Sequence, residues 1–154
     1  MQNLKTISAK FYEVSVAVRE PQADGTEKIV KHAVAVDALS FGEAENIAIA
    51  ELQPEEVINI NPAQYKDVCI SHETEDEKYY KCKLEFITMD EKTMKEKRST
   101  TVYLVQAKSL NRALRYLDDM MAQSTLDYNS VGVVGTNITD IILHSDRIKD
   151  RTDD

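Results

Sequence analysis

The chain contains little glycine and proline, with four glycines and three prolines among 154 residues. Both residue types are scattered, so we expect neither a flexible linker nor a low-complexity segment that would divide the chain. Glycine is also too scarce for a phosphate-binding loop, and neither GxxxxGK[ST] nor GxGxxG occurs in the sequence. The two common glycine-rich nucleotide-binding loops are thereby excluded.

Long apolar runs are also missing. No stretch is long enough to cross a bilayer, and the start of the chain lacks the apolar core of a signal peptide. We therefore expect a cytoplasmic protein without a membrane partner. The two cysteines, Cys69 and Cys82, lie in alternating strand patterns, and we interpret both as buried free thiols. The formal net charge of −8 argues against general attraction to nucleic acid but permits a local basic patch.

Reactive side chains do not gather in any part of the sequence. Cys69 and His72 are spaced like a metal-binding pair, but residues three apart on a strand point to opposite faces. The acidic connector, residues 73–77, lacks the alternation of a calcium loop, and we interpret it as a solvated linker between two repeats. We therefore predict no metal site, no cofactor and no catalytic residues, and we expect that the protein is not an enzyme.

The sequence does contain a repeat. Residues 102–113 match residues 33–44, sixty-nine positions earlier, in their apolar, alanine and serine positions. Each of these stretches has the pattern of a strand that leads into a helix capped by serine. The alternating strand pattern of residues 11–18 likewise recurs at residues 79–86. These matches indicate two copies of one unit, each composed of a β-hairpin, a helix and a long strand.

We accordingly predict an α+β fold of about six strands and two helices, with a mostly antiparallel sheet. The repeats 10–71 and 78–144 are expected to pack about a pseudo-twofold axis as a single domain, because about seventy residues alone would bury little core. A polar tail at residues 145–154 is expected to follow. Whether the repeats share one sheet or pack as two sheets is left open by the pattern.

Local signals place the elements within each copy. Ser40 and Glu43 form a capping box that starts the first helix, and Ser109 caps the second. Apolar residues at helical spacing continue from both caps. The extended segment 57–71 is interrupted near Asn61-Pro62 by a bulge, a bend or a break between two strands.

One surface offers a candidate binding site. Residues 78–98 contain seven basic and four acidic side chains, and the strand face opposite the core is expected to present Tyr79, Lys81 and Lys83. An aromatic ring among lysines is what sheets use to bind single-stranded nucleic acid, and Phe11 takes the position of Tyr79 in the first copy. An ordinary solvated hairpin is the alternative interpretation. The full candidate set is Phe11, Tyr79, Lys81, Lys83, Lys97 and Arg98.

Several short strings resemble an uncharacterised family, domain of unknown function 4494. They lie at residues 36–41, 43–45, 79–92, 96–98 and 104–107. The resemblance covers about residues 10–144. It implies a small protein of gut anaerobes and their phages or mobile elements, and it supplies neither an activity nor catalytic residues.

Together these observations predict a non-catalytic binding or adaptor protein, encoded by a phage or a mobile element. Its partner would be an unknown protein or small molecule, bound between the two copies, because a duplicated fold offers two similar surfaces or one central cleft. The alternative is a single-stranded nucleic-acid-binding protein that uses the Tyr/Lys face of the second repeat.

Overall fold

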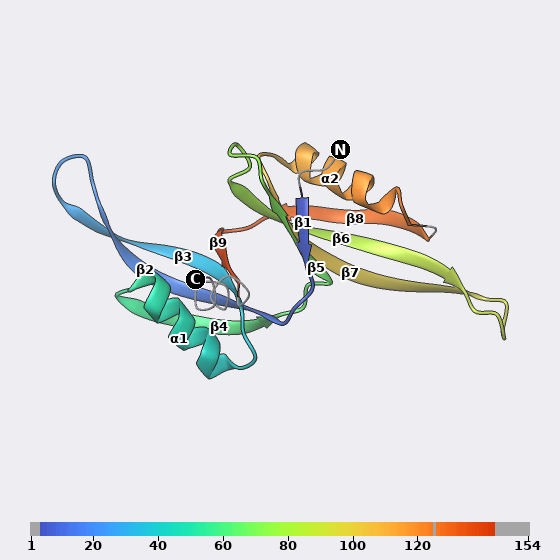
Figure 1. Ribbon diagram of the computed structural model, residues 1–154, viewed down its shortest axis with the longest axis horizontal. Helices are drawn as coiled ribbons and strands as arrows, with labels where there is room; N and C mark the ends of the chain where they lie inside the picture. Colours follow the sequence, from blue (N-terminus) through green and yellow to red (C-terminus); the bar gives the residue numbers. More distant parts are fainter. Residues whose placement is uncertain (1–3, 125, 144–154) are drawn as a thin grey trace, which may run out of the picture. The chain divides into compact units, whose positions relative to one another are not determined.

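Two long β-hairpins are the centres of two sheets in the computed structural model, which describes residues 4–124 and 126–143 (Figure 1). The first hairpin joins β2 (Phe11–Pro21) to β3 (Glu27–Asp37), and the second joins β6 (Lys78–Met89) to β7 (Glu96–Ala107). Alternation of apolar side chains produces these strands, because every second residue points to the same sheet face. The described residues form two helices and nine strands, an α+β fold.

One helix follows each hairpin and covers one face of its sheet. Helix α1 (Phe41–Leu52) starts at Ser40, whose Oγ accepts a hydrogen bond from the Glu43 N–H at 3.1 Å. Helix α2 (Leu110–Met121) starts at Ser109, whose Oγ accepts from the Arg112 N–H at 3.1 Å. Both predicted helix starts are confirmed, and the serine caps satisfy backbone donors that have no partner within the helix.

The chain divides into two compact units, each with its own sheet. Unit 1 comprises Met1–Ser8 and Tyr65–Thr136, and unit 2 comprises Ala9–Gln64 and Asn137–Asp154. The sheet of unit 1 has the order β1-β5-β7-β6-β8, and that of unit 2 has the order β4-β2-β3-β9. The remaining strands are β1 (Leu4–Ile7), β4 (Glu56–Ala63), β5 (Asp67–Ser71), β8 (Asp127–Gly135) and β9 (Ile138–Ile142).

The last strand of each predicted repeat pairs with the hairpin of the other repeat. Strand β5 runs parallel to β7, with Cys69 opposite Val105. Strand β9 runs parallel to β3, with Ile142 opposite Val36. All other strand pairs are antiparallel. The compact units therefore do not coincide with the sequence repeats 10–71 and 78–144, because each unit takes a strand from both.

The pairing patterns of the two units correspond closely. The antiparallel register of β2 against β4 shifts at Ser15/Val16, and that of β6 against β8 shifts at Lys83/Leu84, sixty-eight positions later. An irregularity of this kind inserts one unpaired residue and increases the local twist. The internal duplication itself stays a prediction, and a superposition of the two units is its test.

Three details differ from the sequence expectations or refine them. The structure has nine strands in its described residues where about six were predicted, partly because β1 lies before the first repeat, where no strand was predicted. Strand β1 pairs antiparallel with β5, which stabilises a segment too short and polar to be recognised alone. Segment 57–71 does break, after Ala63. His144 and the tail 145–154 lie outside the described residues.

Candidate functional site

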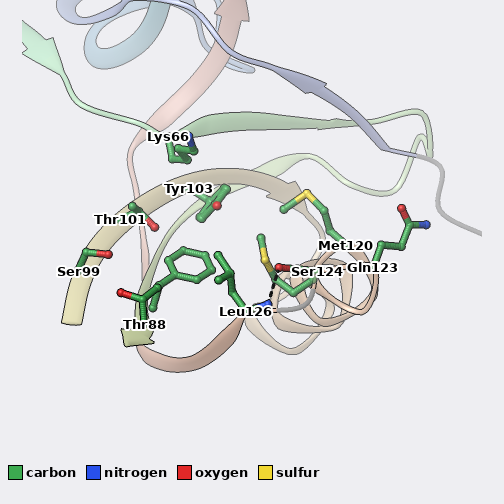
Figure 2. A pocket seen from close by; sticks show the side chains of 11 residues that line it. Lys66, Thr88, Ser99, Thr101, Tyr103, Met120, Gln123, Ser124 and Leu126 are labelled. Atoms are coloured by element: carbon green, nitrogen blue, oxygen red, sulfur yellow. Dashed lines mark hydrogen bonds between the residues drawn. The ribbon is translucent and has the colours of Figure 1, made fainter. Parts of the chain in front are cut away.

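A pocket of about 480 Å³ lies in unit 1, where the end of α2 meets the hairpin β6–β7 (Figure 2). Its volume falls within the range of small-molecule sites, about 300–1,000 Å³. The segment just before β5, the hairpin, α2 and the connection from α2 to β8 all contribute to it. We call it the α2 pocket, and the residues that line it are Lys66, Phe86, Thr88, Ser99, Thr101, Tyr103, Met120, Met121, Gln123, Ser124 and Leu126.

The geometry of the pocket follows from where α2 ends. Alternation places Thr101 and Tyr103 on the same face of β7 as Val105, which is buried in the core beneath α2. Helix α2 ends at Met121, whereas the hairpin continues beyond it to Met89 and Glu96. The outer part of this sheet face is therefore bordered by the connection to β8 instead of by another helical turn.

Sulfur atoms and rings form the apolar part of the site. The Cys69 thiol donates to Met120 Sδ at 3.9 Å, and the rings of Phe86 and Tyr128 lie 6.3 Å apart. Burial raises the pKa of both Cys69 and Cys82 to about 12, so neither thiol ionises at neutral pH. The interpretation of the cysteines as buried free thiols is confirmed, and neither is poised as a nucleophile.

The polar part of the site lies on β7 and beside it. Burial, and next the charge of Asp67, raise the pKa of the Tyr103 phenol, which therefore stays a neutral O–H donor. The Thr101 hydroxyl is the one buried side-chain oxygen in the described residues without a hydrogen bond of normal geometry, although it lies near enough to Tyr103 to act on that phenol. The main chain of Lys66 lies next to β7, since the Lys66 backbone N–H donates to the Val102 carbonyl at 2.7 Å.

A second polar cluster corrects the interpretation of the acidic connector as a solvated linker. Asp76 is only 2% exposed. Its Oδ2 accepts hydrogen bonds from Ser71 Oγ and Tyr116 Oη, each at 2.5 Å, and its Oδ1 accepts from the Lys108 N–H at 2.8 Å. Arg112 Nη1 lies 3.5 Å from Oδ1. A charged side chain is stable in a buried position when it is paired and hydrogen-bonded in this way.

The Asp76 cluster is built to hold structure together. Burial acts to raise the pKa of Asp76, but the hydrogen bonds from Ser71 and Tyr116, the Lys108 N–H and the Arg112 charge outweigh it and lower that pKa. The Asp76 carbonyl also accepts from Gln106 Nε2 at 2.9 Å. Because its oxygens are occupied, we interpret this carboxylate as a link between the end of β5 and the start of α2, and not as a reactive acid.

The structure contradicts the expectation that Tyr79 is exposed. Tyr79 is 6% exposed and Phe11 is 1% exposed, so neither ring is available for a nucleic-acid base to stack upon. Both residues lie on the strand face opposite the helix, and alternation predicted a solvated face there. Residues on both faces of the hairpins are in fact buried, as the consecutive burial of Tyr103, Leu104 and Val105 illustrates.

The basic members of the candidate set are only partly brought together. Lys83, Lys97 and Arg98 are exposed and Lys81 is half-buried. Strand alternation places Lys81, Lys83 and Arg98 on one face of the hairpin, whereas Lys97 lies on the face of the α2 pocket. Arg98 donates to Glu85 at 3.0 Å and to Glu96 at 3.4 Å, which compensates its charge. Nucleic-acid binding stays a prediction, now without its stacking rings.

Neither a metal-binding cluster nor a membrane-spanning helix is found in the part of the chain that the structure describes. In residues 4–124 and 126–143, no group of three or more His, Cys, Asp or Glu side chains is placed to hold a metal ion. In the same residues, no helix has both the length and the apolar character needed to span a membrane.

Comparison with protein families identifies the chain's relatives. Residues 10–144 match the family model described as Domain of unknown function (DUF4494). The chain belongs to this family. The resemblance noted in the sequence is thus confirmed over the span expected for it. Neither the curated proteins nor the solved structures that were compared with the chain gave a match.

Proposed function

We propose that this member of the DUF4494 family is a non-catalytic binding protein, and that it binds a small, largely apolar molecule in the α2 pocket. The observation that carries the proposal is the pocket itself, which combines a suitable volume with phenylalanine, leucine and two methionines in its lining. Methionine side chains adapt their shape to different ligands, and pockets of this composition bind small molecules in many proteins.

The state of the reactive groups supports a role in binding over a role in catalysis. The Cys69 and Cys82 thiols stay protonated at neutral pH because burial raises their pKa. The Asp76 carboxylate already accepts hydrogen bonds on both oxygens. A nucleophile or a general acid–base group needs a free, suitably ionised atom beside the substrate, which these groups do not offer.

The proposal places the ligand within unit 1, whereas the sequence suggested a ligand between the two copies. An adaptor role toward a protein partner and binding of single-stranded nucleic acid stay as second and third candidates. A cytoplasmic location and an origin in a phage or mobile element complete the proposal. They rest on the sequence and on the family resemblance, and the genes that flank this one would test the second of them.

The test is a titration with a fluorescent apolar probe such as anilinonaphthalene sulfonate. We expect saturable binding to one site in the wild type. Thr101→Phe should abolish it by filling the pocket, because the Thr101 side chain contributes to the lining. Thr100→Phe is the matched control, since Thr100 is exposed on the opposite face of β7 and should leave probe binding unchanged.

Thermal unfolding of both variants establishes that they are folded before the probe is added. Equal loss of binding in Thr101→Phe and Thr100→Phe, or equal retention in both, would place the probe elsewhere and overturn the assignment to the α2 pocket.

A further inference from the structure

The two walls of the α2 pocket differ in chemistry. The wall formed by the end of α2 and the following connection presents the apolar side chains of Met120, Met121 and Leu126, together with the polar Gln123 and Ser124. The wall formed by β7 presents hydroxyl groups at alternate positions, from Ser99, Thr101 and Tyr103 (Figure 2). A ligand that fits both walls needs a long apolar body and a polar group along one side or at one end.

The charge of the residues that line the pocket indicates which polar group a ligand should carry. Among the described residues that line the pocket, Lys66 alone carries a formal charge. The Lys66 main chain is fixed next to Val102, the residue between Thr101 and Tyr103, by the 2.7 Å hydrogen bond from its N–H. Lys66, Thr101 and Tyr103 all line the pocket, so one ammonium group and two hydroxyl groups border the same space, and all three are hydrogen-bond donors.

The two hydroxyls are prepared to donate. The Thr101 hydroxyl is buried without a hydrogen bond of normal geometry, which is an unfavourable state that a ligand acceptor would relieve. The Tyr103 phenol is 3% exposed, and burial raises its pKa, so that it keeps its proton. Asp67 acts on the Tyr103 phenol by its charge; burial raises the pKa of Asp67, and the nearby Lys66 charge opposes that increase. A cationic ligand attracted by Asp67 is the competitor that must be tested.

We propose that the α2 pocket takes a medium-chain monocarboxylate, with its alkyl body against Met120, Met121 and Leu126 and its carboxylate held by Lys66, Thr101 and Tyr103. This inference rests on the proposed function, because it names the class of ligand for the same site. Two hydroxyl donors and an ammonium group suit a carboxylate, which accepts charge-assisted hydrogen bonds on both oxygens.

The test is isothermal titration calorimetry with decanoate, decanol and decylamine, each below its aggregation threshold. Wild-type protein should bind decanoate more tightly than decanol and decylamine. Lys66→Met should weaken decanoate binding about tenfold, since a charge-assisted contact is lost, and leave decanol binding unchanged. Thr101→Val keeps the side-chain volume and should weaken decanoate more than decanol. Lys81→Met is the matched control, because Lys81 lies on the opposite face of the hairpin and its loss should change neither affinity.

The outcomes separate the two proposals. Tighter binding of decylamine, equal binding of decanoate and decanol, or equal weakening of both by Lys66→Met would refute the carboxylate assignment and leave an apolar binding site in place. Absence of saturable binding for all three compounds, together with unchanged probe binding in Thr101→Phe, would refute the α2 pocket as a site altogether.

Discussion

Units 1 and 2 share a strand-and-helix framework but differ where the helix ends. In unit 1 the face beyond α2 carries the hydroxyls of Thr88 and Thr101. At the matching positions of unit 2, sixty-eight and sixty-nine residues earlier, stand Glu20 and His32, whose side chains meet at 2.6 Å between Glu20 Oε1 and His32 Nε2. The comparison teaches that the same framework carries two hydroxyl residues at these positions in one unit and an interacting acid–histidine pair in the other.

The connections that follow the helices differ as well. In unit 2 the connection spans residues 53–55, and the Glu55 N–H donates to the Ala17 carbonyl at 2.8 Å, which ties it to β2. In unit 1 it spans residues 122–126, and the Ser124 N–H donates to the Met121 carbonyl at 2.9 Å, so it turns back onto the helix end. The longer connection leaves space against the sheet and lines it.

The largest effect is expected at a feature of unit 1 alone. Asp76 is the buried carboxylate among the described residues, and Asp76→Ala would remove the acceptor that the Ser71 and Tyr116 hydroxyls share and one of the two carboxylates paired with Arg112. We expect the free energy of unfolding to fall by about 3 kcal/mol, the typical result of breaking a buried charged network. Urea denaturation measures it.

Glu77→Ala is the matched control for that measurement, because Glu77 is adjacent but exposed. Its effect should stay within about 0.5 kcal/mol. Similar losses of unfolding free energy for the two variants would mean that the Asp76 cluster does not stabilise unit 1 more than an exposed side chain does.

The Glu20–His32 pair of unit 2 can be introduced by mutation at the matching positions of unit 1. The double variant Thr88→Glu with Thr101→His copies the Glu20–His32 pair into the α2 pocket and should weaken probe binding at least about tenfold, or about 1.4 kcal/mol. The reverse change, Glu20→Thr with His32→Thr, should not create a binding site, because residues 53–55 stay tied to β2. Fluorescence titration measures both, and a gain of binding in unit 2 would contradict the role given to the connection.

Low pH should reduce the stability of unit 1 because it protonates Asp76. Its pKa in the folded state is held below the ordinary value of 3.8. The stabilising contribution is therefore complete above that ordinary value and is lost as pH falls through the lower folded-state pKa. We expect the difference in stability between the wild type and Asp76→Asn to shrink below about pH 3.8. A difference that grows with acid would show that the carboxylate is not ionised in the folded protein.

The smallest effect is expected for the Glu20–His32 pair in unit 2. Both side chains are partly exposed, at 43% and 26%, so solvent screens their interaction. A double-mutant cycle with Glu20→Gln and His32→Gln should give a coupling free energy of about 0.5 kcal/mol. A coupling free energy of zero would show that the contact between Glu20 and His32 does not contribute to stability.

Local structure could be predicted well from the sequence because its signals are local. The serine at each helix start, Ser40 and Ser109, and the alternation along the hairpins have direct backbone consequences within a few residues. The break before β5 lies close to the expected position, since β4 continues through Asn61-Pro62 and ends at Ala63.

Long-range partners could not be predicted in the same way. Strands β5 and β9 pair with β7 and β3, but their apolar patterns suit any covered sheet. The burial of Tyr79 has the same origin, because alternation defines two faces without telling which of them is covered. Asp76 lies in an acidic run that resembles a solvated linker, and its partner Tyr116 is forty residues away.

The α2 pocket was missed, although a signal existed. Thr88, Ser99 and Thr101 are polar residues on the strand face that alternation assigns to the core, and such residues mark places where the core is interrupted. The offset between the copies rises from sixty-nine at the helix caps to seventy-three in the last strand, and two of these four additional positions lie in the connection after the helix, residues 122–126 against 53–55. Together these two irregularities locate the site.

Methyl-detected nuclear magnetic resonance during a decanoate titration tests the central claim most directly. The account predicts that the methyl signals of Met120, Met121 and Leu126 shift in a saturable manner, while those of Ile47, Leu52 and Val57 around α1 do not move. Shifts confined to the residues around α1, or spread equally over both groups, would contradict a ligand site at the end of α2 in unit 1.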